Sequence, residues 1–130
     1  MEFLKIKETC LYVHDLEQAL DFYHRVLGLP IIDYRESKHL FLRAGASVLL
    51  LFNPMDSRTK ESPPAHYGGG KQHFAFEVKT GDYEDSKTEM MQKGIHIIDE
   101  VTWRSGRKSF YFNDPEGNVL EVLPENGVWD

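Results

Sequence analysis

The chain has 130 residues, of which 41% are hydrophobic and 12% aromatic, and this is enough apolar material for a packed core. Its 15 basic and 21 acidic residues give a formal net charge of -6, which argues against nucleic acid or an anionic membrane as the partner. The N-terminal residues lack the apolar run of a signal peptide, and no stretch is long enough to span a bilayer, so we expect a cytoplasmic protein. The single cysteine, Cys10, excludes an intrachain disulfide and fits a reducing compartment.

The first predicted element is a strand in the stretch "KIKETCLYV". Its residues alternate, with Leu11 and Val13 on one face and Glu8, Cys10 and Tyr12 on the other. The first pair is typical of a face that packs against a core. The sequence therefore predicts a half-buried strand whose second face carries polar and reactive side chains.

A helix is expected directly after this strand. Asp15 is placed to cap its N-terminus, and Gln18, three residues later, completes a capping-box pattern. An apolar stripe follows, and Gly28 ends the helix. Three short strands are predicted next, at residues 30–34, 39–43 and 47–52.

The second half of the chain repeats this order of elements. A strand at residues 72–78 precedes a helix from about Asp82 to Lys93, which Gly94 ends, and the strands "HIIDE", "KSFYF" and "NVLEVL" follow. The pattern is βαβββ, written twice, and it predicts an α+β fold of eight strands in two repeats. We expect a single domain over 1–130, with repeat one at about 3–53, a linker at 54–71 and repeat two at about 72–124.

The stretch between the two repeats is rich in proline, glycine and polar residues, which is typical of a linker or a mobile loop. Its length allows two interpretations, a solvated tether or a loop that contributes to binding. If it is a binding loop, His66 and Tyr67 are the side chains that could reach a ligand.

The strand "QHFAFEV" places His73 on the face opposite Phe74 and Phe76. His73 lies five residues before Val78, as Glu8 lies five before Val13, so the two are at equivalent positions of the repeat. The simplest interpretation is a histidine on a solvent-facing strand. Whether His73 has a second metal-ligating side chain beside it depends on the residues at the equivalent strand positions of the two repeats.

The last strands of the two repeats supply the next equivalent pair. Alignment through the prolines that follow these strands pairs Leu51 with Glu121, whereas alignment through the preceding glycines selects Leu49. Glu8, His73 and Glu121 therefore form a candidate metal site with an aliphatic residue at the fourth position. One imidazole and two carboxylates suit Mn²⁺, Fe²⁺, Co²⁺, Ni²⁺ or Zn²⁺, and three protein ligands leave positions for water and substrate.

Glu121 strengthens this hypothesis because it interrupts an otherwise apolar strand, where an unpaired buried carboxylate is costly. The alternative is a carboxylate on a wet face, paired with Lys108 or Arg43. Tyr12, Cys10 and Tyr111 have the strand parity that places side chains in the same cleft, where aromatic hydroxyls would orient a substrate.

The stretches "VHDLEQALDFYHRVLGL", "QHFAFEV" and "SFYFNDPEGNVLEVL" resemble the vicinal oxygen chelate superfamily, which includes glyoxalase I, bleomycin-resistance proteins and extradiol dioxygenases. The resemblance implies paired βαβββ modules that form a curled eight-stranded sheet around a metal or ligand cleft, assembled as a homodimer. It places the ligands on Glu8, His73 and Glu121, with an apolar residue where glyoxalase I has a fourth ligand. The glutamate at the first position and the Glu, His, Glu set depart from the two histidines and one carboxylate of extradiol enzymes.

The resemblance also implies the chemistry, in which two neighbouring oxygens of a small substrate bind the metal and a carboxylate such as Glu121 or Glu8 acts as the base. We therefore expect a metal-dependent lyase or isomerase of the glyoxalase type. Two alternatives stay open, a ring-cleaving dioxygenase and a bleomycin-resistance-like protein that binds a ligand without turnover. A requirement for metal in product formation, rather than in ligand binding alone, distinguishes the enzyme from the binder.

Overall fold

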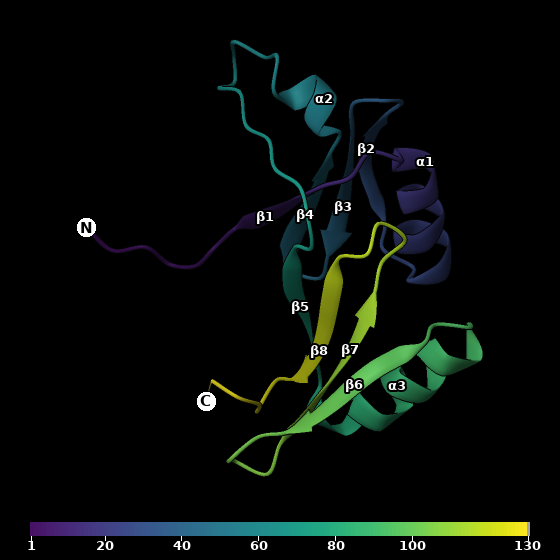
Figure 1. Ribbon diagram of the computed structural model, residues 1–130. Helices are drawn as coiled ribbons and strands as arrows, with labels where there is room; N and C mark the ends of the chain where they lie inside the picture. Colours follow the sequence, from purple (N-terminus) through teal and green to yellow (C-terminus); the bar gives the residue numbers. More distant parts are fainter. Residues whose placement is uncertain (130) are drawn as a thin grey trace. The chain divides into compact units, whose positions relative to one another are not determined.

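The computed structural model describes residues 1–129, which form two compact units, one from Met1 to Gly70 and one that begins at Lys71. Each unit has the element order βαβββ, so the α+β class and the repeat predicted from the sequence are confirmed (Figure 1). The eight strands are hydrogen-bonded as two four-stranded sheets, one in each unit. Within the part of the chain that the structure describes, no helix is long and apolar enough to cross a membrane.

The first unit contains four strands and three helical segments. They are β1 (Glu8–Tyr12), α1 (Leu16–Ala19), the π-helical segment η1 (Leu20–Val26), β2 (Ile31–Arg35), β3 (His39–Ala44), β4 (Ser47–Phe52) and α2 (Pro54–Ser57). The second unit contains the corresponding strands and one long helix. They are β5 (His73–Val78), the 3₁₀ turn η2 (Thr80–Asp82), α3 (Tyr83–Gln92), β6 (Ile97–Thr102), β7 (Lys108–Asn113) and β8 (Val119–Pro124).

Both sheets have the same topology. The strand orders are β1-β4-β3-β2 and β5-β8-β7-β6, and in each sheet the first pair is parallel and the others are antiparallel. The same irregularity also recurs, since β2 shifts register between Ile31 and Asp33 and β6 shifts between Ile97 and Asp99. The repeat predicted from the sequence therefore extends to the strand order, the strand directions and the position of the register shift.

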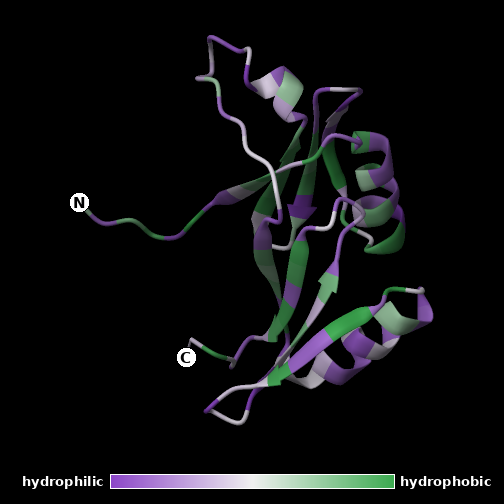
Figure 2. Cartoon of the chain, in the orientation of Figure 1, coloured by the Kyte–Doolittle hydropathy of each residue, from purple (hydrophilic) through white to green (hydrophobic). Residues whose placement is uncertain are grey.

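One face of each sheet forms the core of its unit, and we call it the core face. In Figure 2 the strands carry most of the hydrophobic colour, while α3 is largely hydrophilic. Tyr83 is the residue of α3 that is buried, and its ring lies 5.4 Å from that of Phe110 on β7. Burial of each large apolar side chain contributes about 1.5–3 kcal/mol. The buried hydrophobic strand residues of the core faces are Leu11, Leu40, Leu42, Leu49, Leu51, Phe110, Phe112, Leu120 and Val122.

The opposite face of each sheet, which we call the open face, carries the alternate residues. On the first sheet these are Glu8, Cys10, Tyr12, Val48, Leu50, Phe52, His39, Phe41 and Arg43. On the second sheet they are His73, Ala75, Glu77, Val119, Glu121, Leu123, Ser109, Tyr111 and Asn113. The face assignment predicted for "KIKETCLYV" and "QHFAFEV" is confirmed by the alternating burial of β1 and β5.

The first helix begins where the sequence predicts. The side chain of Asp15 accepts a hydrogen bond from the backbone N–H of Gln18 at 3.0 Å, as expected for the N-terminal cap. After one turn, however, the helix widens into a π-helix, in which Leu27 N–H bonds to Phe22 O at 2.9 Å. This widening was not predicted, because the apolar stripe that marks a helix does not distinguish the two windings.

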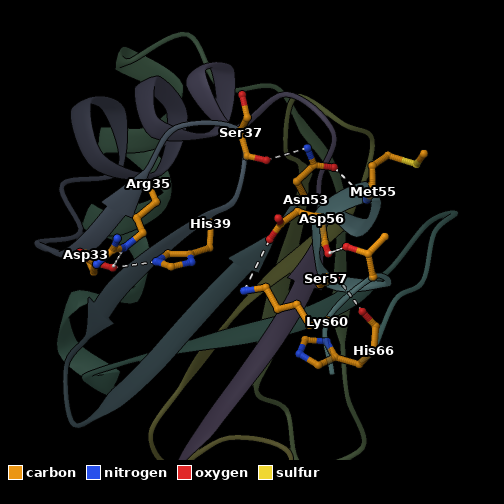
Figure 3. A network of polar contacts seen from close by, with 11 residues as sticks. Asp33, Arg35, Ser37, His39, Asn53, Met55, Asp56, Ser57, Lys60 and His66 are labelled. Atoms are coloured by element: carbon orange, nitrogen blue, oxygen red, sulfur yellow. Dashed lines mark hydrogen bonds and ion pairs between the residues drawn. The ribbon is translucent and has the colours of Figure 1, made fainter. Parts of the chain in front are cut away.

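The stretch expected to be a linker contains local structure. Asn53 caps α2 by accepting a hydrogen bond from Met55 N–H at 3.0 Å, and Ser57 Oγ donates to the carbonyl of His66 (Figure 3). Further along, a Cβ on Gly68 would lie 2.9 Å from the Tyr12 ring. This segment therefore packs on the open face of the first sheet instead of forming a solvated tether.

Candidate metal centre

His73 is fixed by the strand next to its own. It is the first residue of β5, and its Nδ1 lies 2.8 Å from the carbonyl oxygen of Val119, its partner in the parallel ladder. A carbonyl can only accept a hydrogen bond, so Nδ1 carries a proton and donates it. In the neutral imidazole this leaves the lone pair on Nε2, which is the form that binds metals.

Nε2 of His73 points toward the carboxylate of Glu121 on β8. The distance from Nε2 to Oε2 is 3.3 Å, and the Glu121 side chain is 9% exposed while that of His73 is 50% exposed. Two lone pairs at this distance repel each other unless a cation lies between them or Nε2 is itself protonated. A divalent ion or a proton satisfies the pair, so the atoms present fit a metal.

Tyr111 borders this pair on β7. It is the ladder partner of Glu121, and its ring stacks on that of His73, with centroids 6.2 Å apart and planes at 26°. Burial raises the pKa of the Tyr111 hydroxyl; a hydrogen bond from Ser109 opposes the shift, and one to Glu121 adds to it. Tyr111 is therefore a neutral donor that orients the Glu121 carboxylate.

Ser109 and Trp103 extend this group of hydrogen-bonded side chains. The indole N–H of Trp103 donates to Ser109 Oγ at 2.9 Å, and Ser109 is fully buried two residues before Tyr111. Ser109 was missed in the sequence, although its strand parity matches that of Tyr111. Together these side chains form a chain of hydrogen bonds that leads from Trp103 toward Glu121.

The turn between β7 and β8 positions both candidate ligands. Asp114 Oδ1 accepts hydrogen bonds from the backbone N–H groups of Glu116 and Asn118, at 2.9 and 2.8 Å, and Asn118 Nδ2 donates to Asp114 Oδ2 at 2.9 Å. The oxygen of the Asn118 amide accepts from Gln72 N–H at 3.0 Å. Gln72 precedes His73 in the chain, so the buried Asn118 connects the start of β5 to the start of β8.

The two ladders also define which residues of the two units are equivalent. Glu8 pairs with Val48 and Cys10 with Leu50, as His73 pairs with Val119 and Ala75 with Glu121. The equivalence of Glu8 and His73 therefore follows from the registers. The residue equivalent to Glu121 is Leu50, and the alignment that selected Leu51 or Leu49 was wrong.

The physical reason for this correction is the alternation of faces along β4. Leu51 and Leu49 are almost fully buried on the core face, whereas Leu50 is half-buried on the open face. The prolines used for the alignment lie at different distances from their ladders, since Pro124 ends β8 and Pro54 follows β4 by two residues. The fourth position is aliphatic, as predicted.

The substrate-cleft residues predicted on β1 form a cluster of their own. Cys10 Sγ donates to the Tyr12 hydroxyl at 3.8 Å, and a hydrogen bond of 2.8 Å joins this hydroxyl to Nδ1 of His66. Burial, assisted by the hydrogen bond with Cys10, raises the pKa of Tyr12 to about 12. Tyr12 is therefore a neutral hydroxyl at neutral pH, and His66 does contact the open face of the first sheet.

The predicted metal ligands are thus divided between the units. His73 and Glu121 lie together in the second unit, and the exposed Glu8 begins β1 in the first. Within residues 1–129, no group of three or more His, Cys, Asp and Glu side chains forms a metal cluster. The alternative partners considered for Glu121, Lys108 and Arg43, are not its partners in any ion pair of the described residues.

The sequence matches the Glyoxalase/Bleomycin resistance protein/Dioxygenase superfamily over residues 5–122, and the chain belongs to this superfamily. The crystal structure of a lactoylglutathione lyase from Agrobacterium tumefaciens has a TM-score of 0.91 at 31% sequence identity, and the match covers 96% of each chain.

Two related sequences are transferases. The glutathione transferase FosA of Serratia marcescens is 30% identical over 120 residues, which are 90% of this chain and 78% of that protein. The metallothiol transferase FosB of Staphylococcus haemolyticus is 27% identical over 112 residues, 85% of this chain and 76% of that protein. The resemblance noted in the sequence is therefore confirmed at the level of the superfamily.

Proposed function

We propose that this protein is a metal-dependent enzyme of the glyoxalase type, a lyase or isomerase that acts on a small molecule with two neighbouring oxygens. In this proposal His73 and Glu121 hold a divalent ion, and Glu8 is the third ligand. The observation that carries it is the tautomer of His73, whose Nδ1–H is committed to Val119 O at 2.8 Å so that Nε2 is left for a cation beside Glu121.

The donor atoms restrict the ion. One imidazole nitrogen and carboxylate oxygens suit Zn²⁺, Ni²⁺, Co²⁺, Mn²⁺ or Fe²⁺, and no thiolate is involved. The contribution of Glu8 is proposed from its equivalence to His73 in the two ladders. The relative named as a metallothiol transferase is a metal-dependent protein by its name, which supports a metal in the family.

When bound, the ion supplies a positive charge that stabilises negative charge developing on the substrate oxygens. The residues of the chain then have separate roles. A carboxylate, Glu121 or Glu8, accepts the proton from the carbon next to those oxygens. Tyr111 keeps the Glu121 carboxylate in place by donating a hydrogen bond to it.

A second candidate function is the transfer of a thiol to a small electrophile. It is favoured by the similarity to the glutathione transferase FosA, at 30% identity. The lyase and the transferase would use the same metal but give different products, an isomerised adduct in one case and a new thioether in the other. A homodimer in the cytoplasm is part of both proposals.

The test begins with metal analysis by plasma mass spectrometry, before and after chelator dialysis and reconstitution with each of the five ions. We expect about one ion per chain, a ratio set by the proposed ligand set. The reconstituted protein is then assayed with hemithioacetals of glutathione and 2-oxoaldehydes, which are isomers of thioesters such as lactoylglutathione. Metal-dependent thioester formation supports the lyase.

The other outcomes are equally specific. Metal-dependent loss of free thiol with an electrophile, and no isomerisation, would replace the lyase by the transferase. A protein that takes up none of the five ions would contradict the metal-dependent proposal and leave a ligand-binding protein. Analytical ultracentrifugation of the same samples checks the expected dimer.

A further inference from the structure

The open face of the first sheet holds a histidine that the proposed metal centre does not use. His39 begins β3 and is 9% exposed, and its Nε2 donates to Asp33 Oδ2 on β2 at 2.7 Å (Figure 3). This hydrogen bond lowers the pKa of Asp33 and fixes the proton on Nε2. Nδ1 is buried, and among residues 1–129 it has no hydrogen-bond partner.

An orphaned ring nitrogen in a buried position is costly, because it gave up water without gaining a partner. In the neutral ring with its proton on Nε2, Nδ1 carries a lone pair that can accept a hydrogen bond. Such an acceptor is satisfied by an O–H or N–H group that the described chain does not supply.

Two phenylalanine rings, those of Phe41 and Phe52, contact the His39 ring. The ring of Phe41 stacks on His39, with centroids 4.0 Å apart and planes at 9°, and Phe52 lies edge-on to Phe41 at 5.4 Å. His66, from the loop after α2, packs edge-on against Phe52 at 4.6 Å. Phe41 and Phe52 are half-buried and so keep part of their surface accessible, whereas His66 is exposed.

We call the ring surface formed by Phe41, Phe52 and His39 the aromatic wall. The second sheet does not have the same residues at the equivalent positions. By the ladder registers, Phe41 is equivalent to Tyr111, His39 to Ser109 and Phe52 to Leu123. The second open face therefore has a tyrosine, a serine and a leucine at these positions, and it lacks the stacked pair of His39 and Phe41 and the second phenylalanine. An aromatic wall with one unsatisfied acceptor suits a flat, unsaturated group that bears a hydrogen-bond donor.

We propose that the aromatic wall of the first sheet, formed by Phe41, Phe52 and His39, binds a planar unsaturated or aromatic group whose O–H or N–H donates to His39 Nδ1. The ligand reaches the wall by displacing the exposed His66 side chain. This inference goes beyond the function proposed above, and the binding itself requires no metal.

The experiment uses three probes and chelator-treated protein. Phenol has a flat ring and a donor, anisole has the ring without the donor, and cyclohexanol has the donor without the flat ring. Binding is followed by amide chemical shifts in two-dimensional NMR titrations. We expect phenol to bind about 2–10-fold more tightly than anisole, as one hydrogen bond would give, and more tightly than cyclohexanol. The shifts should centre on β3, β4 and Gly68.

Two variants separate the hydrogen bond from the stacking. His39→Gln keeps an N–H for Asp33 but removes the acceptor at Nδ1, so the phenol preference over anisole should fall to about 1-fold. Phe52→Leu should weaken both probes and preserve their ratio, because it reduces the flat contact surface alone. The matched control, His96→Gln, alters an exposed histidine and should bind like the wild type.

The proposal is overturned if phenol and anisole bind equally to the wild-type protein, if His39→Gln leaves the phenol preference unchanged, or if the shifts lie outside the first unit. Because the metal has been removed, none of these results depends on the metal centre. A protein that binds phenol as expected but takes up no metal would keep this inference and contradict the proposed enzyme.

Discussion

Replacing His73 with alanine should abolish stoichiometric metal binding. The substitution removes the Nε2 ligand that faces Glu121 Oε2 at 3.3 Å, so affinity should fall by more than the ~10–100-fold that loss of an outer-shell partner costs. The fold should persist, because the His73 side chain is half exposed and lies on the face opposite Phe74. Metal content per chain and a titration with a competing chelator measure the effect.

The matched control is His96→Ala, which removes an exposed histidine just before β6. It should leave the metal content unchanged. If His73→Ala retains a full equivalent of metal, His73 is not a ligand, and the proposed site moves elsewhere in the chain. Circular dichroism of both variants shows whether loss of metal comes from loss of structure.

Replacing Asn118 with alanine should cost about 2–5 kcal/mol of unfolding free energy, since it removes the hydrogen bonds that the buried Asn118 amide makes with Asp114 and Gln72. Its amide donates to Asp114 Oδ2 at 2.9 Å and accepts from Gln72 N–H at 3.0 Å, and the residue is 1% exposed. The variant should also bind metal less well, because Gln72 and Val119 fix the position of His73. Urea unfolding and metal titration measure the two effects.

Asn126→Ala is the corresponding control, because Asn126 is exposed in the turn after β8. Its unfolding free energy should change by less than about 0.5 kcal/mol, as is usual for exposed positions. An Asn118→Ala variant as stable as the wild type would show that the turn is not held by these hydrogen bonds. A stable variant that also binds metal normally would remove its role in positioning His73.

Much of the fold could be predicted because the repeat is written into the sequence with period-two strands and capped helices. Asp15 and Gly28 marked the limits of the first helical region, and the alternation in "QHFAFEV" assigned the faces of β5 correctly. The π-helical winding after Ala19 has no sequence signal of this kind, because it depends on how the wider turn packs.

The residues of the candidate site were harder to predict from the sequence than the fold, because their positions depend on the register between paired strands. The choice between Leu49, Leu50 and Leu51 in a run of leucines depends on which backbone groups pair, and prolines outside the ladders gave the wrong offset. His39 was missed for a related reason. Its partner, Asp33, lies on a neighbouring strand, and only the observed pairing of β2 with β3 brings the two together.

The two sheets have the same ladder register, so the candidate ligand pair could be built at the equivalent positions of the first sheet. Glu8 and Leu50 occupy in the first sheet the places that His73 and Glu121 occupy in the second. A single exchange, Leu50→His, would therefore set an imidazole beside Glu8 and create the same ligand pair with its order reversed. Chemistry in such a duplicated fold can be gained or lost on one half without any change to the packed side that holds the sheet together.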